Sequence, residues 1–145
     1  VPLLSSDLVL YVRKGHPLAK QKSVLPEELS HMKFIQLDDD FFSVEAMLEE
    51  VFAFGKNPGC LPKTVTTNSS SLMIRMLENT DLGNIGSYWL SEMYRQNDFG
   101  RLRIEGLEQK ITFGYLKYQG RPLASHLTDF LSFLEGALEK DHKKT

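Results

Sequence analysis

The sequence predicts an α/β fold with a mixed, mainly parallel sheet and helices on both of its faces. Short apolar runs rich in β-branched residues alternate along the chain with segments whose apolar residues recur at helical spacing. Gly, Pro, Asn and Ser clusters separate these segments. Such alternation is typical of βαβ units, in which right-handed crossovers join parallel strands.

The first quarter of the chain contains two predicted strands. Residues 7–12 form a nearly continuous aliphatic run and are followed by a turn at residues 13–17, which indicates a buried strand. Residues 26–29 begin with Pro and two acidic residues, which favours one short helical turn. A second strand is expected at residues 34–37, and it leads into an acidic aromatic loop at residues 38–42.

Two helices and one strand are predicted in the middle of the chain. Ser43 is a suitable N-cap for a helix that Gly55 ends, and its apolar stripe is Val44, Met47, Leu48, Val51 and Phe52. Residues 63–67 are rich in β-branched side chains and predict a strand. Residues 68–71 offer several N-caps for the next helix, which Asn79 is expected to close in a left-handed conformation.

Three strands and two helices are predicted between residue 83 and residue 140. A very short strand lies between Gly83 and Gly86, and a short helix follows at residues 87–94. Alternating apolar residues predict strands at 102–104 and 111–118. A long amphipathic helix is expected at about residues 123–140.

Composition limits the classes of function. The 145 residues suffice for one domain or two small lobes, and no apolar run approaches the roughly 20 residues of a membrane-spanning helix. The net charge is −2 and the 17 Lys and Arg residues form no basic stripe, so these 145 residues are not expected to bind DNA or a membrane. Cys60 is the single cysteine, which favours a reducing, cytoplasmic compartment.

No motif indicates an enzyme or a cofactor. The four histidines are scattered, and no serine stands in a Gly-x-Ser-x-Gly elbow with an identifiable base, so no catalytic residue is assigned. Neither a dinucleotide fingerprint nor a phosphate loop is present. Asp38, Asp39 and Asp40 lack the spaced ligand set of a calcium loop and are expected to form a solvated acidic loop, so no metal is assigned.

Three loops are candidate binding loops because each follows a strand and precedes a helix. They comprise residues 38–43, 68–71 and 86–88. In open α/β sheets, ligands bind beyond the carboxyl ends of the strands, where helix N-termini present unpaired N–H groups. Ser43, Asn68, Ser69 and Ser70 would then bind a polar or carboxylate effector, although ordinary helix capping explains the same residues and the three aspartates oppose an anion nearby.

The order of several short motifs resembles the effector-binding domains of LysR-type transcriptional regulators. These motifs are residues 16–19 (His-Pro-Leu-Ala), 26–29 (Pro-Glu-Glu-Leu), 34–35 (Phe-Ile), 83–86 (Gly-Asn-Ile-Gly) and 121–124 (Arg-Pro-Leu-Ala). The resemblance covers essentially the whole chain. The sequence departs from the family after Gly86, where Ser-Tyr-Trp replaces small or aliphatic residues and Pro, which puts the ligand contacts there in doubt.

The resemblance implies a periplasmic-binding-protein-like lobe with two crossing hinge strands. Residues 1–14 would be the first crossing strand from lobe I, residues 15–105 the regulatory lobe II, and residues 106–145 the return strand and the terminal helix of lobe I. A helix-turn-helix domain and the first half of lobe I would be absent from this sequence. The hinge would include Arg13, Tyr115 and Tyr118.

The function implied is that of a small-molecule effector-binding domain and not an enzyme. A metabolite would bind between the lobes, at Ser43, Asn68, Ser69, Ser70, Ser87 and Tyr88, and would rearrange a homodimer or homotetramer that binds DNA through the absent domain. Tyr88 is equally suited to core packing. The alternatives are a lobe of an extracytoplasmic solute-binding protein and a ligand-sensing domain of a metabolic enzyme.

Overall fold

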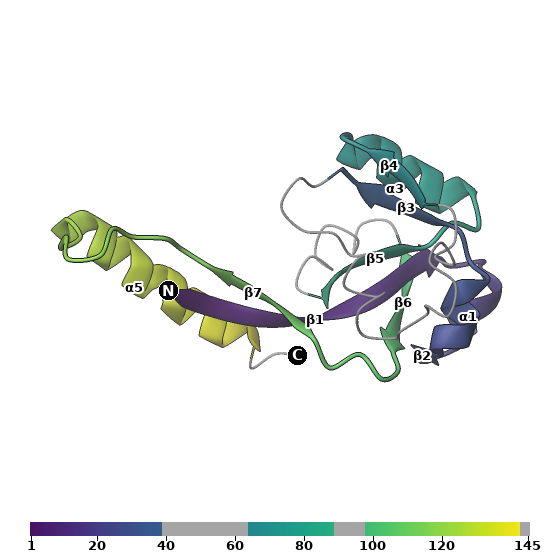
Figure 1. The fold of residues 1–145 in the computed structure, drawn as a ribbon, viewed down its shortest axis with the longest axis horizontal. Helices are drawn as coiled ribbons and strands as arrows, with labels where there is room; N and C mark the ends of the chain where they lie inside the picture. The colour runs from purple at the N-terminus through teal and green to yellow at the C-terminus, as the bar shows by residue number, and fades with distance from the viewer. Residues whose placement is uncertain (39–63, 89–97, 143–145) are drawn as a thin grey trace. The chain divides into compact units, whose positions relative to one another are not determined.

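The computed structural model describes residues 1–38, 64–88 and 98–142 (Figure 1). The chain forms two compact units, of which one comprises residues 7–110 and the other comprises residues 1–6 with residues 111–145. Strand β1 (Pro2–Arg13) contributes residues to both units, so the chain passes between them at Ser6–Asp7 and again at Lys110–Ile111.

The larger unit is built on a mixed sheet in the order β2-β6-β1-β5. The strands are β2 (Ser23–Val24), β5 (Asn84–Ser87) and β6 (Phe99–Ile104), on either side of β1. Strand β1 runs antiparallel to both β5 and β6, whereas β2 and β6 are parallel. The expected α/β class and mixed sheet are confirmed, and the antiparallel pairs lie on both sides of the central strand.

A second pair of strands lies beside this sheet. Strands β3 (Phe34–Leu37) and β4 (Thr64–Thr67) are parallel, in register from Phe34 with Thr64 to Leu37 with Thr67. A parallel bridge between Phe34 and Gly83 places β3 beside the start of β5. The carboxyl ends of β3, β4 and β5 therefore point toward the same edge.

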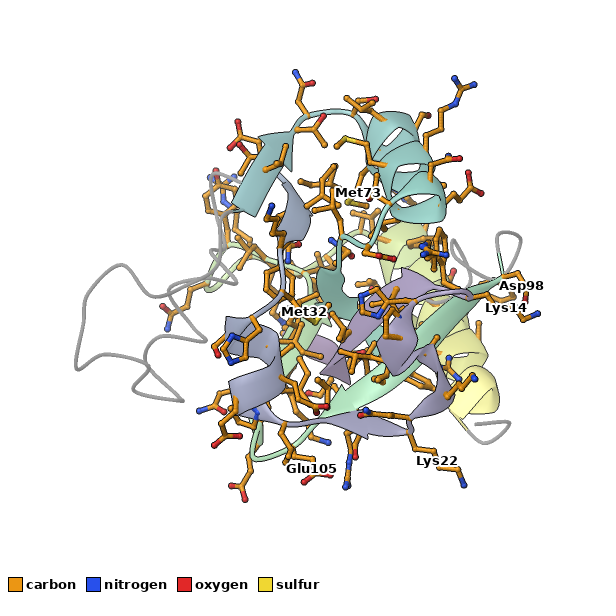
Figure 2. All side chains as sticks on the ribbon, turned by 90° about the vertical axis from the view of Figure 1, so that its right-hand side faces the viewer. Lys14, Lys22, Met32, Met73, Asp98 and Glu105 are labelled. Atoms are coloured by element: carbon orange, nitrogen blue, oxygen red, sulfur yellow. The ribbon has the colours of Figure 1, made fainter. Side chains whose placement is uncertain are left out.

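Side chains of β1 alternate between two apolar layers, as expected for a central strand. Val9 and Tyr11 pack with Ile35 of β3 and with Met73 and Leu77 of helix α3 (Ser70–Asn79). Figure 2 labels Met73 between α3 and the strands.

Leu10 lies on the opposite face, near Met32, which follows helix α1 (Pro26–Ser30). A Cβ atom on Gly83 would approach the ends of both side chains to 2.9 Å, so glycine permits this close packing.

The smaller unit contains residues 111–114 of strand β7 (Lys110–Gly114), which pairs with β1, and helix α5 (Ser125–His142). The Val1 ammonium donates to the Tyr115 carbonyl at 2.8 Å, and the Tyr115 amide donates to the Val1 carbonyl at 3.0 Å. A Cβ atom on Gly114 would lie 2.3 Å from the Val1 carbonyl oxygen, so this pairing requires glycine.

Several predicted boundaries change. Strand β1 begins at Pro2 and not at residue 7, because its first residues pair with β7. Strand β7 ends at Gly114 and not at residue 118, because β1 begins at Pro2 and the described residues offer no further partner strand. The predicted helix at residues 43–55 lies outside the described residues, as does most of the one at residues 87–94.

The predicted left-handed closure of α3 at Asn79 is wrong. Among described residues other than glycine, only Asp98 has a positive φ. The Asn79 side chain donates to the Arg75 carbonyl at 2.7 Å, and the Thr80 hydroxyl donates to the Met76 carbonyl at 2.6 Å. Side chains satisfy these last carbonyls, so the helix does not need a left-handed residue.

No helix in the described part of the chain combines the length and apolarity that crossing a lipid bilayer requires.

Candidate functional site

The second and third predicted binding loops lie at the same edge of the sheet. The first residue of the first loop also lies at this edge. Asp38 follows β3, Asn68 follows β4, and Tyr88 follows β5. The Asp38 amide donates to the Thr67 carbonyl at 2.8 Å, which joins the start of the first loop to the end of β4. The first two loops are about thirty residues apart in the sequence, and the parallel register of β3 and β4 places their first residues side by side.

The N-terminus of α3 presents hydrogen-bond donors at this edge. Ser69 is its N-cap, because the Ser69 hydroxyl accepts from the Leu72 amide at 3.3 Å while its own backbone is extended. The amides of Ser70 and Ser71 belong to the first turn, where no intrahelical acceptor exists. Asn68 is exposed and Ser70 is half-buried, so both are accessible to a ligand.

Ser87 is less accessible than the other predicted binding residues that the structure describes. Its residue surface is 1% exposed, and its carbonyl accepts from the Tyr11 hydroxyl at 2.8 Å. This bond fixes the carboxyl end of β5 to the central strand, so Ser87 positions the edge in the structure described.

Tyr88 packs partly against the core cluster of Val9, Tyr11 and Ile35. The Arg101 guanidinium lies 4.2 Å from the centre of its ring, a cation–π contact. The packing alternative is therefore present in the structure, and a ligand contact by Tyr88 stays a prediction.

Ser43 lies outside the described residues, and the three predicted hinge residues are distributed over both units. Arg13 ends β1 and forms an ion pair with Asp81, with 2.6 Å between the guanidinium and the carboxylate. Tyr118 is 80% exposed, and the Arg121 guanidinium lies 5.6 Å from its ring centre. Their hinge role stays a prediction.

Three features of this region were not predicted. The Thr67 hydroxyl accepts from the Ser69 amide at 3.1 Å and fixes the loop before the cap. Arg101 of β6 contacts the Tyr88 ring. Asp7 and Lys110, the first and last residues of the larger unit, form an ion pair with 3.1 Å between the carboxylate and the ammonium group. A Thr two residues before an N-cap is a weak local signal, whereas the other two contacts join residues that are distant in sequence.

His16 caps the 3-10 helix Pro17–Lys20 that follows β1. Its Nδ1 atom accepts from the Leu18 amide at 3.1 Å, so the proton of the neutral ring is on Nε2. Burial lowers the pKa of His16, and the Arg13 charge acts in the same direction, whereas Asp81 opposes the shift. The ring therefore acts as a neutral structural acceptor.

Among the described residues, no group of three or more His, Cys, Asp or Glu side chains is arranged to hold a metal ion. The polar groups at the loop edge are hydroxyls, amides, backbone N–H groups and the Asp38 carboxylate. Such groups bind and orient a polar molecule through hydrogen bonds.

Solved structures share this fold over nearly the whole chain. The effector-binding domain of QuiR in complex with shikimate matches with a TM-score of 0.69 and 18% identity, over 97% of this chain and 65% of that one. The regulatory domain of Synechocystis PCC6803 CcmR in complex with 2-PG matches with a TM-score of 0.69 and 17% identity, over 94% and 65% of the respective chains.

A full-length regulator matches over a smaller part. CbnR complexed with its target DNA has a TM-score of 0.57 and 17% identity, over 77% of this chain and 38% of that one. The chain thus spans less than two thirds of the length of these structures. The search of curated proteins gives no match.

The model of the LysR substrate-binding domain family matches residues 1–139, which is nearly the complete sequence. The mixed α/β fold agrees with this match. The chain belongs to the LysR substrate-binding domain family.

Proposed function

We propose that this chain is the sensing part of a LysR-type transcriptional regulator and binds a small polar metabolite at the loop edge. The observation that carries the proposal is the convergence of the ends of β3, β4 and β5 on the N-terminus of α3. Amides and hydroxyls gathered there offer donors to acceptor oxygens of a ligand. The described edge contributes Asn68, Ser69 and Ser70 to this proposed site, with Tyr88 as an apolar neighbour.

The mechanism requires a ligand that prefers one arrangement of the two units. The chain crosses between the units twice. A ligand that contacts both units would favour one arrangement of them only if it binds that arrangement with higher affinity than the other. We further propose that residues 1–14 and 106–145 belong to lobe I and residues 15–105 to lobe II, and that Arg13, Tyr115 and Tyr118 act near the hinge. Preceding residues would supply the rest of lobe I and the helix-turn-helix domain.

Similar structures support a ligand-dependent regulator over the two alternatives. QuiR and CcmR were solved with small molecules, and CbnR was solved with its target DNA. We propose by analogy that a homodimer or homotetramer of the cytoplasmic regulator contacts DNA through its helix-turn-helix domains. This chain would act as a binding domain without catalysis.

Ser69 provides the sharpest test of the loop edge. Ser69→Asp retains an acceptor for the Leu72 amide, but its carboxylate also competes for the neighbouring amides of the first turn. We expect S69D to keep its melting temperature within about 2 °C and to weaken effector binding at least about tenfold. Binding is measured by calorimetry on the intact regulator with metabolites found by thermal-shift screening.

Gln119→Glu is the matched control, because it adds one negative charge at an exposed position of the smaller unit. It should leave the affinity unchanged. Equal affinities of S69D and the wild type for every metabolite that binds would place the site elsewhere. Promoter footprints of the wild type that do not change on saturation would contradict the switching mechanism.

A further inference from the structure

An open groove of about 760 Å³ lies within the larger unit, at the edge opposite to the proposed effector loops. It is lined by residues that follow the end of β1 and by residues that precede β3 and β5, whereas Asn68 and Tyr88 follow the ends of β4 and β5. Its volume is within the roughly 300–1,000 Å³ typical of small-molecule sites. The groove is therefore separate from the loop edge.

The groove has a mostly apolar floor and a polar rim. Leu18, Met32 and Leu82 supply apolar surface from three different segments, and Lys33 and His31 stand at the rim. Figure 2 labels Met32 between α1 and the sheet, away from Lys22 at the lower edge. A molecule that fits this groove needs an apolar body and one polar end.

The acidic groups of the groove are already engaged. The Glu28 carboxylate accepts from the Leu25 amide at 2.8 Å and from the Gln21 side chain at 3.3 Å. The Asp81 carboxylate pairs with the Arg13 guanidinium at 2.6 Å. These contacts keep both acids in place and offset the negative charge of Asp81.

The basic side chains of the rim are not engaged in this way. Within residues 1–38, 64–88 and 98–142, no acidic group forms an ion pair with Lys33 or His31, and both residues are exposed. Lys33 therefore offers a positive charge at the rim, in a groove that also contains the Glu28 carboxylate, whose hydrogen-bond donors are neutral groups. A carboxylate, sulfonate or phosphate group complements an exposed ammonium group beside an apolar surface.

We propose that this groove is a second binding site, which takes a small organic anion with an apolar body. The anionic group pairs with Lys33, and the apolar body lies on Leu18, Met32 and Leu82. This site is independent of the proposed effector site, because no residue is common to both. An occupant would link the turn after β1 to the segment after α3, since the groove contains residues of both.

The test uses 8-anilinonaphthalene-1-sulfonate, an anion with an apolar aromatic body, and the full 145-residue chain. Amide chemical shifts are followed by nuclear magnetic resonance during the titration. We expect the saturable shifts to include the amides of His16, Leu18 and residues 28–33 and 80–82. Lys33→Glu should weaken this binding at least about tenfold, and Lys33→Met should weaken it less, because charge reversal adds repulsion to the lost attraction.

Two controls separate charge from apolar contact and from general effects on the fold. Lys22→Glu makes the same charge change at an exposed residue outside the groove and should leave the affinity unchanged. The uncharged probe N-phenyl-1-naphthylamine should bind K33E and the wild type equally well. Unshifted groove amides, or equal anion affinity of K33E and the wild type, would overturn the proposal.

A protein partner is a distinguishable outcome. If the groove amides respond to protein concentration but not to the sulfonate probe, and K33E removes that response, the groove is a protein contact and the small-molecule proposal is wrong. The probe is followed only at the amides of the groove. A negative result in this titration therefore does not contradict the proposed effector site at Asn68–Ser70, and a negative result with S69D does not contradict the proposed groove site.

Discussion

At the scale of single residues, His16 has a structural role that depends on its protonation state. Its Nδ1 lone pair holds the Leu18 amide, and a proton on Nδ1 would remove that acceptor. The groups that act on the ring are Asp81, which favours the charged form, and Arg13, which opposes it, but burial dominates and lowers the pKa. The folded chain therefore prefers the neutral ring.

This preference predicts a loss of stability in acid. The unfolded chain takes up the proton near the ordinary pKa of 6.5, whereas the folded chain does so at lower pH. The contribution of His16 is fully present above pH 6.5 and declines as the pH falls from there toward the folded-state pKa. His16→Asn keeps a side-chain cap without titration, so it should lose less free energy of unfolding between pH 7.5 and 5.5.

Urea unfolding at several pH values measures this difference. His31→Asn, at an exposed histidine in the same unit, is the control and should follow the wild type. Parallel pH profiles for H16N and the wild type would show that the cap does not titrate in this range.

At the scale of secondary-structure elements, α3 is the helix on which the proposed site depends. Its N-cap is a single hydroxyl, and its first turn lies at the loop edge. Ser69→Ala leaves the Leu72 amide without this acceptor. We expect a loss of about 1 kcal/mol in the free energy of unfolding, the usual value for a lost N-cap.

Ser71→Ala is the matched control because Ser71 is exposed and lies inside the helix, where alanine is favoured. Chemical denaturation should find S71A at least as stable as the wild type. If both variants lost the same free energy, the Ser69 hydroxyl would not be acting as a cap.

Local patterns predicted most elements but not how the strands pair. The capping residues at 68–71 predicted the start of α3, and the amphipathic pattern at residues 123–140 predicted α5 to within a few residues. The antiparallel pairing of β1 with β5 and β6 was not predicted, because an apolar run has the same pattern in either direction.

The same limit applies to the candidate site. Asn68 and Ser69 were found because capping residues follow a strand, which is a local signal. The contact between Arg101 and Tyr88 joins β6 to the residue that follows β5, and nothing near either residue in the sequence indicates the other. Burial of Ser87 also depends on partners that are distant in sequence.

At the scale of the whole molecule, the smaller unit exposes an apolar ridge on α5. Leu127, Phe130 and Phe133 are 44%, 57% and 76% exposed and recur every three residues along one side of the helix. Exposed contiguous apolar surface of this kind usually marks a contact with another part of a protein. The proposed remainder of lobe I would provide such a contact in the intact regulator.

The ridge predicts that the 145-residue chain by itself associates with further copies. Sedimentation velocity over a range of concentrations should show reversible association, because burial of the phenylalanine rings removes apolar surface from water. Replacing both Phe130 and Phe133 with Ser should raise the dissociation constant at least about tenfold. Leu116→Ser is the control, since Leu116 is fully exposed and lies outside α5, and it should leave association unchanged. A chain that stays monomeric at all concentrations, or one that L116S affects as strongly, would show that the ridge does not drive assembly.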